Sequence, residues 1–226
     1  MKKQNKVSQP TASKKSIRVL IVDDHSLIRR GMVAVLSEQN DLEVCGQTDS
    51  AGALEALKDS KPDVIVVDIT MRGASGLDLI KQIAYDPRVK ILALDLNAEG
   101  TYATRAIKNG AKGYLTDTPD EKLAPAIRRI HAGQLAVSDV VAQQMVASIM
   151  QTNSGEPMDA LSDKELEVAE FMGKGLSTSQ IGEALKISIK TVETHKAHMK
   201  TKLGIAKGSQ LVRYCVQWYE QRNAKN

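Results

Sequence analysis

Apolar positions in the first 135 residues form short runs that alternate with stretches of helical periodicity. IRVLIV and DVIVV are continuous and rich in β-branched residues, the form expected of parallel strands buried on both faces. The pattern predicts strands over 17–22, 42–47, 63–67, 89–94 and 112–115, and helices over about 26–38, 50–59, 76–84, 98–109 and 119–132. This five-fold alternation predicts an α/β fold, a five-stranded parallel sheet that is doubly wound.

The pattern changes in the last third of the chain. A helical stretch at 140–150 is followed by QTNSGEPMD, whose Ser, Gly and Pro mark a linker. Beyond it the strand signal disappears, and residues 162–222 predict helices only. We therefore expect four parts: a disordered basic tail, an α/β domain, a linker helix with its linker, and an all-α domain, over residues 1–16, 17–137, 138–158 and 159–226.

Charge is unevenly distributed along these parts. The chain carries +4 overall, made of +5 in residues 1–16, −4 in 17–157 and +3 in 158–226. The tail is expected to be solvated and disordered, with an accessory nucleic-acid arm as the alternative. No apolar run approaches the roughly 18 residues needed to span a bilayer, and no apolar stretch follows the first lysines, so we expect a cytoplasmic protein without a membrane partner.

The two cysteines do not point to redox chemistry. Cys45 lies in a strand-like apolar run and Cys215 in a helical one. Both are interpreted as small core residues rather than as a disulfide or reactive thiols.

Acidic residues stand at the ends of four of the five predicted strands. Asp23 and Asp24 follow the first strand, Asp68 the third and Asp95 the fourth, and Asp117 follows the fifth. A single acid of this kind often caps a helix or forms a turn. The carboxyl ends of parallel strands, however, meet in one crevice, so these acids are expected to converge. Oxygen-rich clusters suit Mg²⁺, which is the expected cofactor.

The stretches IRVLIVDDHSLIRRGMVAVL, DVIVVDITMRGASGLDLI and GAKGYL resemble the receiver domain of two-component response regulators, over residues 17–135. The resemblance implies a phosphoacceptor, Asp68, modified by a sensor histidine kinase. It also implies a Mg²⁺ ion held by Asp23, Asp24, Asp68 and the carbonyl of Thr70, and an aromatic switch residue at Tyr114. A carboxylate beside a metal can accept a phosphoryl group because the ion neutralises charge on the transferring oxygens.

The sequence departs from this family at three positions of the pocket. Asp95 stands where the family has Ser or Thr, Asp117 where it has Lys, and Arg72 where it usually has Pro. In the family the hydroxyl and the ammonium hold the phosphoryl group, whereas acids repel a dianion at close range. We therefore expect weak or no conventional phosphorylation of Asp68, with Arg72 supplying some positive charge.

The stretch LSDKELEVAEFMGKGLSTSQIGEALKISIKTVETHKAHMKTKLGI resembles the LuxR/NarL-type helix-turn-helix of the same regulators. Ser177 with Gln180 predicts a capping box, and Ser188 is expected to cap a second helix that ends near Leu203. Val192, His195, Met199 and Leu203 form its core stripe. The resemblance implies base reading by Glu193, Thr194 and Ala197, and phosphate contacts by Lys190, Lys196 and Lys200.

The last helix, GSQLVRYCVQWYEQ, places Leu211, Cys215 and Trp218 at helical spacing. In the family this helix pairs two modules on inverted half-sites, which implies a homodimer on double-stranded DNA. Packing of the three residues onto the core of their own domain is the alternative.

Three functions fit these observations. The first is a DNA-binding transcriptional response regulator whose receiver controls dimerisation and DNA binding. In the second, the receiver of such a regulator is a protein- or ligand-interaction module that works without phosphorylation. The third is a Mg²⁺-dependent phosphatase, which is disfavoured because Thr70 stands where such an enzyme needs a general acid. We therefore expect a regulator that is not an enzyme.

Overall fold

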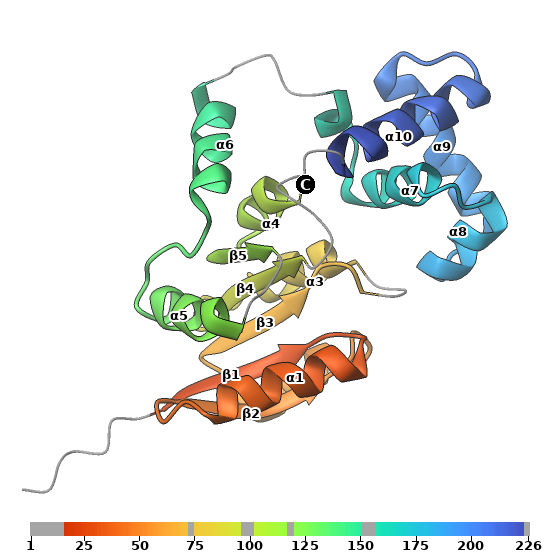
Figure 1. The fold of residues 1–226 in the computed structure, drawn as a ribbon. Helices are drawn as coiled ribbons and strands as arrows, with labels where there is room; N and C mark the ends of the chain where they lie inside the picture. The colour runs from red at the N-terminus through yellow and green to blue at the C-terminus, as the bar shows by residue number, and fades with distance from the viewer. Residues whose placement is uncertain (1–15, 72–74, 96–101, 117–119, 151–156, 224–226) are drawn as a thin grey trace, which may run out of the picture.

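A computed structural model describes residues 16–71, 75–95, 102–116, 120–150 and 157–223. Its first part is a single sheet of five parallel strands in the order β2-β1-β3-β4-β5 (Figure 1). The strands are β1 Ile17–Val22, β2 Leu42–Thr48, β3 Val64–Asp68, β4 Lys90–Asp95 and β5 Gly113–Thr116. The predicted fold class is confirmed, and each strand lies within one residue of its predicted bounds.

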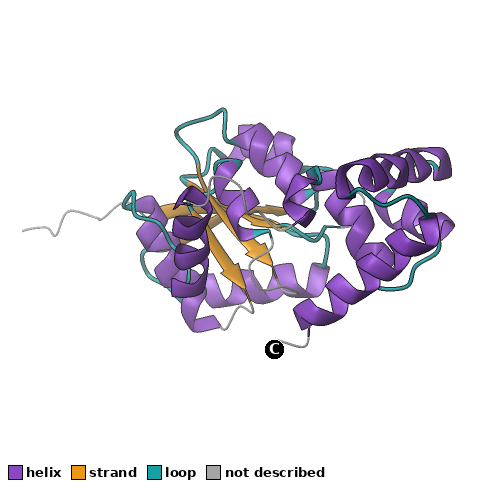
Figure 2. Ribbon diagram, turned by 90° about the horizontal axis from the view of Figure 1, so that it is seen from above, coloured by secondary structure: helices purple, strands orange, loops and turns teal. Residues whose placement is uncertain are grey.

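Helices cover both faces of this sheet (Figure 2). On one face, Met32 and Leu36 pack with Leu123, Ile127 and Ile130 against the sheet, so α1 and α5 form one layer. Apolar residues of α2, α3 and α4 belong to the cluster on the other face. The helices are α1 Ser26–Ser37, α2 Ala53–Ser60, α3 Gly76–Ile83, α4 Ala103–Lys108 and α5 Asp120–His131.

Gly76 brings the start of α3 against the end of β3. A Cβ atom at this position would lie 2.4 Å from the Cα of Ile69 and 2.5 Å from the carbonyl oxygen of Asp68. Backbone cannot give way over such a distance, so only glycine fits here. The close approach holds the start of α3 against Asp68 and Ile69.

The second part is helical, as the sequence predicts. It contains α6 Asp139–Met150, the short 3₁₀ helix η1 Pro157–Ala160, α7 Asp163–Gly173, α8 Thr178–Leu185, α9 Ile189–Leu203 and α10 Gly208–Asn223. The capping box of Ser177 and Gln180 is present, and the hydroxyl of Ser188 accepts a hydrogen bond from the backbone N–H of Thr191 at the start of α9. The 3₁₀ turn lies where the sequence predicts only linker. Among the described residues, no helix has both the length and the apolar character needed to cross a membrane.

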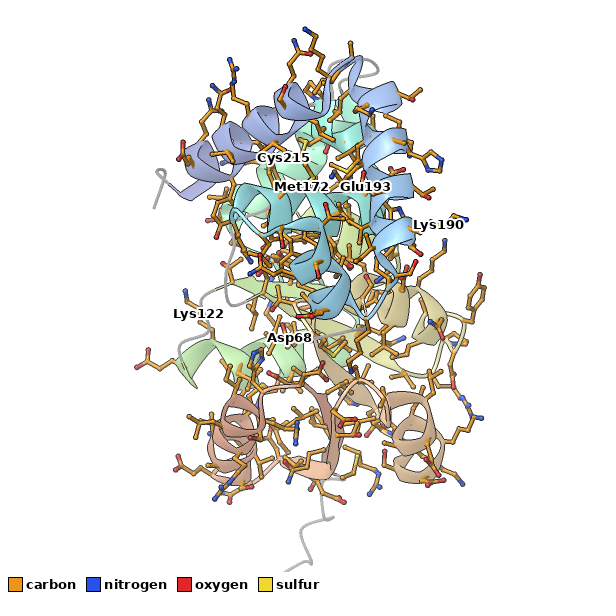
Figure 3. The ribbon with its side chains drawn as sticks, turned by 90° about the vertical axis from the view of Figure 1, so that its right-hand side faces the viewer. Asp68, Lys122, Met172, Lys190, Glu193 and Cys215 are labelled. Atoms are coloured by element: carbon orange, nitrogen blue, oxygen red, sulfur yellow. The ribbon has the colours of Figure 1, made fainter. Side chains whose placement is uncertain are left out.

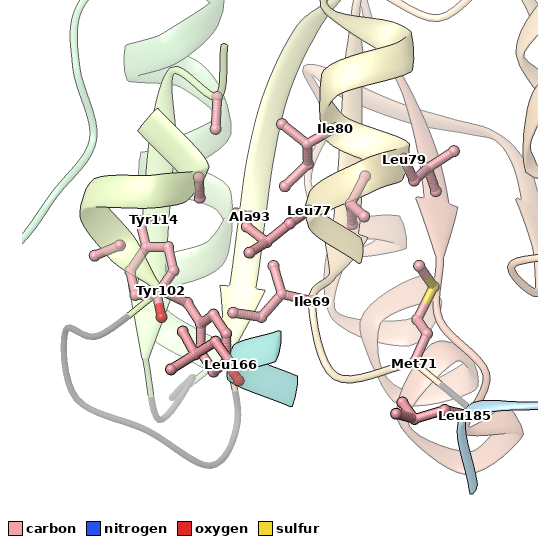
Figure 4. Close-up of a cluster of buried hydrophobic side chains, with 14 of the residues drawn as sticks. Ile69, Met71, Leu77, Leu79, Ile80, Ala93, Tyr102, Tyr114, Leu166 and Leu185 are labelled. Atoms are coloured by element: carbon pink, nitrogen blue, oxygen red, sulfur yellow. The ribbon is translucent and has the colours of Figure 1, made fainter. Parts of the chain in front are cut away.

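The helical domain rests on the carboxyl end of the sheet. Leu166 of α7 lies beside Tyr102, and Leu185 of α8 lies beside Met71 of the loop after β3 (Figure 4). The hydroxyl of Tyr102 donates a 2.6 Å hydrogen bond to Glu170 of α7. Apolar and polar contacts therefore both join the two domains.

A second polar contact joins α4 to the start of α7. The guanidinium of Arg105 donates to the carbonyl oxygens of Leu161, at 2.8 Å, and Met158, at 3.0 Å, and to the carboxylate of Asp163, at 2.9 Å. Its side chain is 15% exposed. One largely buried arginine thus satisfies backbone acceptors that precede the helix as well as an acid in its first turn.

Candidate functional site

Two carboxylates and an imidazole meet at the carboxyl end of the sheet. Asp23 follows β1, Asp68 ends β3, and both are completely buried. One ligand atom from each of Asp23, His25 and Asp68 lies within 4.8 Å of the others. Among the described residues no hydrogen bond reaches Oδ2 of Asp23, Oδ2 of Asp68 or Nδ1 of His25, although this nitrogen lies 3.3 Å from Oδ1 of Asp23 and 3.9 Å from Oδ2 of Asp68.

These buried atoms fit a bound cation. A buried oxygen without a hydrogen-bond partner is costly, and two such oxygens side by side repel each other when both groups are ionised. A hard divalent cation bound by both carboxylates removes both costs, and carboxylate oxygen is the donor that Mg²⁺ prefers. The cluster is therefore consistent with a magnesium site.

The electrostatics of Asp68 agree with this geometry. Burial, with a smaller contribution from the neighbouring Asp23, raises the pKa of its carboxyl to about 6, against hydrogen bonds from Thr70 that lower it. The backbone N–H and the hydroxyl of Thr70 donate to Oδ1 of Asp68, at 3.0 and 2.9 Å. Oδ1 is thus held in place, while Oδ2 faces Asp23 and His25.

Asp24 is directed elsewhere. Its carboxylate accepts hydrogen bonds from the backbone N–H of Ser50, at 2.8 Å, and from the hydroxyl of Ser50, at 3.2 Å. It does not belong to the group of close ligand atoms, in which His25 takes the third place. A role for Asp24 and for the carbonyl of Thr70 as metal ligands stays a prediction.

Asp95 and Tyr114 form a buried pair next to this cluster. Asp95 is completely buried at the end of β4, and the hydroxyl of Tyr114 on β5 donates a 2.7 Å hydrogen bond to its Oδ2. The oxygens of Asp95 are not among the close ligand atoms, and its sharing of one crevice with the other acids stays a prediction. Arg72 and Asp117 lie outside the described residues.

A cavity of about 450 Å³ lies between this edge of the sheet and the helical domain. His25, Thr70 and Met71 line it from the α/β domain, and Phe171 and Leu185 line it from α7 and α8. The loop that supports Asp68 through Thr70 therefore also borders the helical domain.

The predicted DNA-contacting residues lie on α9. Lys190, Glu193, Thr194 and Ala197 are exposed, while Val192 and Met199 are completely buried against the rest of the domain. Figure 3 shows Lys190 at the outer edge of this helix and Glu193 further along it. The hydroxyl of Thr194 donates to the carbonyl of Lys190 at 2.9 Å, so it is bonded within its own helix.

Glu193 is not a free side chain. Its Oε1 accepts a 2.7 Å hydrogen bond from the ammonium of Lys196 and a 3.0 Å hydrogen bond from the hydroxyl of Thr178, the first residue of α8. The ammonium of Lys196 also donates to that hydroxyl, at 3.1 Å. Lys196, predicted to contact phosphate, is thus engaged with two neighbours.

Glu165 ties the other end of α9 to α7. This buried carboxylate completes the capping box with Ser162 and accepts a 2.6 Å hydrogen bond from Lys202. His198 lies 3.7 Å from it. His195, predicted on the core stripe, is half-buried, and burial lowers its pKa.

The burial of two residues on α10 favours packing within their own domain. Leu211 and Cys215 are completely buried in its core, and a role for them in dimerisation stays a prediction. Burial raises the pKa of the Cys215 thiol to about 11. Trp218 is only half-buried, and its role in dimerisation stays a prediction. Both cysteines are free, as expected, although Cys45 is half-buried.

Sequence reasoning missed three residues of these sites. His25 follows the acidic pair directly, and its position two residues after Asp23 was an available signal. Ser50 bonds to Asp24 and Thr178 bonds to Glu193, at sequence separations of 26 and 15 residues. A hydroxyl in a polar stretch gives no indication in the sequence of a partner so far along the chain.

A five-stranded sheet with an acidic cluster at its carboxyl edge, followed by a helical DNA-binding module, defines a response regulator. Residues 19–128 match the response regulator receiver domain, and residues 159–215 match the bacterial regulatory proteins of the luxR family. The chain belongs to the response regulators with a receiver and a LuxR-type helix-turn-helix, a family of DNA-binding transcription regulators rather than enzymes.

Individual relatives agree over nearly the whole chain. The oxygen regulatory protein NreC of Staphylococcus aureus strain MRSA252 is 36% identical over 211 residues, which is 89% of this chain and 97% of NreC. The response regulator ChrA of a heme-sensing two-component system is 29% identical, with a TM-score of 0.50 over 90% of this chain and 98% of ChrA. RcsB of Salmonella typhimurium, at 23% identity, shares the fold, with a TM-score of 0.66 over 90% of this chain and 98% of RcsB.

Proposed function

We propose that this response regulator binds inverted half-sites on double-stranded DNA as a homodimer, and that its receiver controls binding with weak or no conventional phosphorylation of Asp68. The observation that carries the second part is the buried carboxylate of Asp95 at the end of β4, bonded to Tyr114. A carboxylate cannot replace the hydroxyl that holds a phosphoryl oxygen, because it offers negative charge and no donor.

Mg²⁺ is the proposed cofactor of the acidic cluster, held by Asp23 and Asp68. When bound, it would neutralise charge on the oxygens of a phosphoryl group at Asp68. Thr70 orients the carboxylate of Asp68 through two hydrogen bonds to Oδ1, which leaves Oδ2 toward the metal side.

The contacts between the domains support control of DNA binding by the receiver. Tyr102 and Arg105 hold α7, and α7 in turn holds α9 through Glu165 and Lys202. A change in the receiver that moves α4 therefore alters what supports the DNA-contacting helix. RcsB from Salmonella enterica has been solved on promoter DNA with a phosphomimetic, and the same kind of partner is proposed here.

Intact-mass measurement tests the phosphorylation proposal. The chain is incubated with Mg²⁺ and a small-molecule phosphodonor, and we expect little of the adduct of about 80 Da that one phosphoryl group adds. Conversion to the adduct as complete as that of an ordinary receiver run in parallel contradicts the proposal.

Salt dependence of duplex binding tests the DNA proposal. A dimer that neutralises several phosphates should lose affinity with a slope of roughly 0.9 log units per phosphate contact. Lys200→Ala should reduce that slope and weaken binding to all sequences alike. Equal affinity for selected and random duplexes at every salt concentration contradicts sequence reading by α9.

The alternative is a regulator whose receiver responds to a bound protein or small ligand and not to phosphorylation. The cavity of about 450 Å³ between the domains is the observation that favours it, since its size is within the range of small-molecule sites. DNA affinity that changes when a ligand binds in this cavity, in the original protein and in Asp68→Asn alike, would favour this alternative.

A further inference from the structure

We propose that Thr178 is a positioning residue for base recognition: from the first turn of α8, its hydroxyl sets the direction of the Glu193 carboxylate on α9. The inference rests on the proposed reading of bases by Glu193. It assigns a determinant of sequence preference to a residue outside the DNA-contacting helix.

Among the described residues, the hydroxyl of Thr178 bonds only to Glu193 and Lys196. The N-cap of α8 is Ser177, whose own hydroxyl accepts the hydrogen bond from the backbone N–H of Gln180. Thr178 is half-buried, and its hydroxyl donates to Oε1 of Glu193 while accepting from the ammonium of Lys196. Both hydrogen-bonding functions of the hydroxyl therefore serve the Glu193–Lys196 pair.

An isolated ion pair would not hold Glu193 in one direction. Lys196 lies three residues further along the same helix, and exposed pairs of this spacing contribute little because two long side chains must be ordered. The hydroxyl of Thr178 adds an acceptor and a donor from a second helix whose backbone is fixed by its capping box. The carboxylate is then held from two helices at once.

The arrangement suits a reader of base edges. Hydrogen bonds from Lys196 and Thr178 lower the pKa of Glu193, so the carboxylate stays ionised, and Lys196 offsets its repulsion from DNA phosphates. Both neighbours bind Oε1, and no hydrogen bond from a described residue reaches Oε2. A carboxylate oxygen in a major groove can accept a hydrogen bond from the exocyclic amine of cytosine.

Because Thr178 holds the Glu193 side chain in its binding direction, it affects how well Glu193 distinguishes the right base from a wrong one. A side chain already fixed in its binding direction loses less conformational entropy on contact, and it cannot turn to accommodate a wrong base. Without the hydroxyl, Glu193 gains rotamers, and the difference between right and wrong bases falls.

The experiment selects binding sites for the full-length chain from a randomised duplex library and compares Thr178→Val, Thr178→Ser and Glu193→Gln. Valine has nearly the shape of threonine but no hydroxyl, whereas serine keeps the hydroxyl. Thr178→Ala serves as a second variant without the hydroxyl if valine perturbs folding. Ser179→Ala, which changes an exposed neighbour, is the matched control.

Thr178→Val should reduce discrimination at the base pair that Glu193→Gln also alters, by roughly threefold to tenfold, as expected for losing part of one base contact. Affinity for random duplexes should stay within about twofold, because no phosphate contact is removed. Thr178→Ser and Ser179→Ala should keep the original preference. The double change Thr178→Val with Glu193→Gln should add nothing to Glu193→Gln alone.

Two results would overturn the inference while leaving base reading by Glu193 in place. One is an unchanged preference in Thr178→Val alongside a changed one in Glu193→Gln. The other is a uniform loss of affinity for all duplexes in Thr178→Val, which would assign Thr178 to the phosphates. If Glu193→Gln itself leaves the preference unchanged, the proposed role of Glu193 fails, and the inference fails with it.

Discussion

The hydroxyl of Tyr114 donates a 2.7 Å hydrogen bond to Oδ2 of Asp95, and both side chains are at most 1% exposed. In this receiver the aromatic residue of β5 is therefore held inward by a carboxylate at the end of β4. Hydrogen bonds to charged groups in low dielectric surroundings are among the stronger ones in proteins. The pair fixes the conformation of Asp95, one of the positions at which this chain departs from its family.

Tyr114→Phe should remove this hydrogen bond from a buried acid and lower the free energy of unfolding by about 1–3 kcal/mol. Urea unfolding of the full-length chain, followed by circular dichroism, measures the loss. Tyr85→Phe is the matched control, since Tyr85 is 83% exposed. Equal midpoints for the two variants would show that the pair contributes nothing to stability.

Mg²⁺ should raise the melting temperature of the protein, because an ion that binds the folded cluster stabilises it by mass action. Asp68→Asn should remove most of this response, since it takes away one of the two carboxylates with an oxygen free for the ion. Asp59→Asn, which changes an exposed acid of α2, is the control and should respond as the original protein does. A response that survives in Asp68→Asn would place the ion elsewhere.

The double change Asp95→Thr with Asp117→Lys should allow phosphorylation of Asp68. It restores the hydroxyl and the ammonium that hold the phosphoryl oxygens in the family. The measurement is the fraction of the chain that gains the phosphoryl mass after incubation with Mg²⁺ and a small phosphodonor. Adding Asp68→Asn to the double variant should abolish the gain, and an adduct that persists would mean modification at another residue.

Glu165→Gln should destabilise the helical domain by about 1–3 kcal/mol, because it removes the charge that Lys202 neutralises in a buried site. Burial by itself would raise the pKa of Glu165, but hydrogen bonds from Lys202 and Ser162 outweigh it, and the pKa is lowered from 4.5. The folded pKa is below the unfolded one. The stabilisation is therefore fully present above about pH 4.5 and is lost as the pH falls through the folded pKa.

Thermal unfolding of the original protein and of Glu165→Gln between pH 7 and pH 3 tests whether this stabilisation is lost on acidification. The original protein should lose more stability on acidification than Glu165→Gln, so their melting temperatures should approach each other at low pH. Glu183→Gln, at an exposed position of α8, is the control. A difference between the two melting temperatures that widens on acidification contradicts a lowered pKa for Glu165.

Arg105→Ala should loosen the contact between the domains. It removes hydrogen bonds to three backbone carbonyls, those of Met158, Asp159 and Leu161, and to the carboxylate of Asp163, so these acceptors must find water. Small-angle X-ray scattering should report a larger radius of gyration. Arg88→Ala is the control, because that side chain is 86% exposed and pairs only with the nearby Asp86 among the described residues. Identical scattering from both variants would mean that Arg105 does not hold the domains together.

Strand positions and helix caps could be predicted, because short stretches of sequence determine them. Strand positions followed from continuous apolar runs such as that before Asp68, and the caps at Ser177 and Ser188 followed from residue types at fixed spacing. The meeting of Asp23 and Asp68 followed from the rule that parallel strands end at one edge.

What could not be predicted depends on side-chain direction and on distant partners. Asp24 is adjacent to Asp23 but turns to Ser50, a choice that the β2–α2 loop makes. Asp95 ends its strand as Asp68 does, yet Tyr114 takes up one of its oxygens. Helical spacing placed Leu211 and Cys215 on one stripe but could not tell a domain core from a dimer interface, because both are apolar.

Because α7 is held by Tyr102 and Arg105 on one side and carries Glu165 on the other, the two domains are not interchangeable parts. A chimera that joins this receiver to the DNA-binding domain of another regulator would bring a first helix without acceptors matched to those two side chains. Grafts should therefore work best when the donor segment begins after α7, or when Glu170 and Asp163 are transplanted with it. The same constraint predicts that α4 and α7 change together when such regulators diverge in sequence.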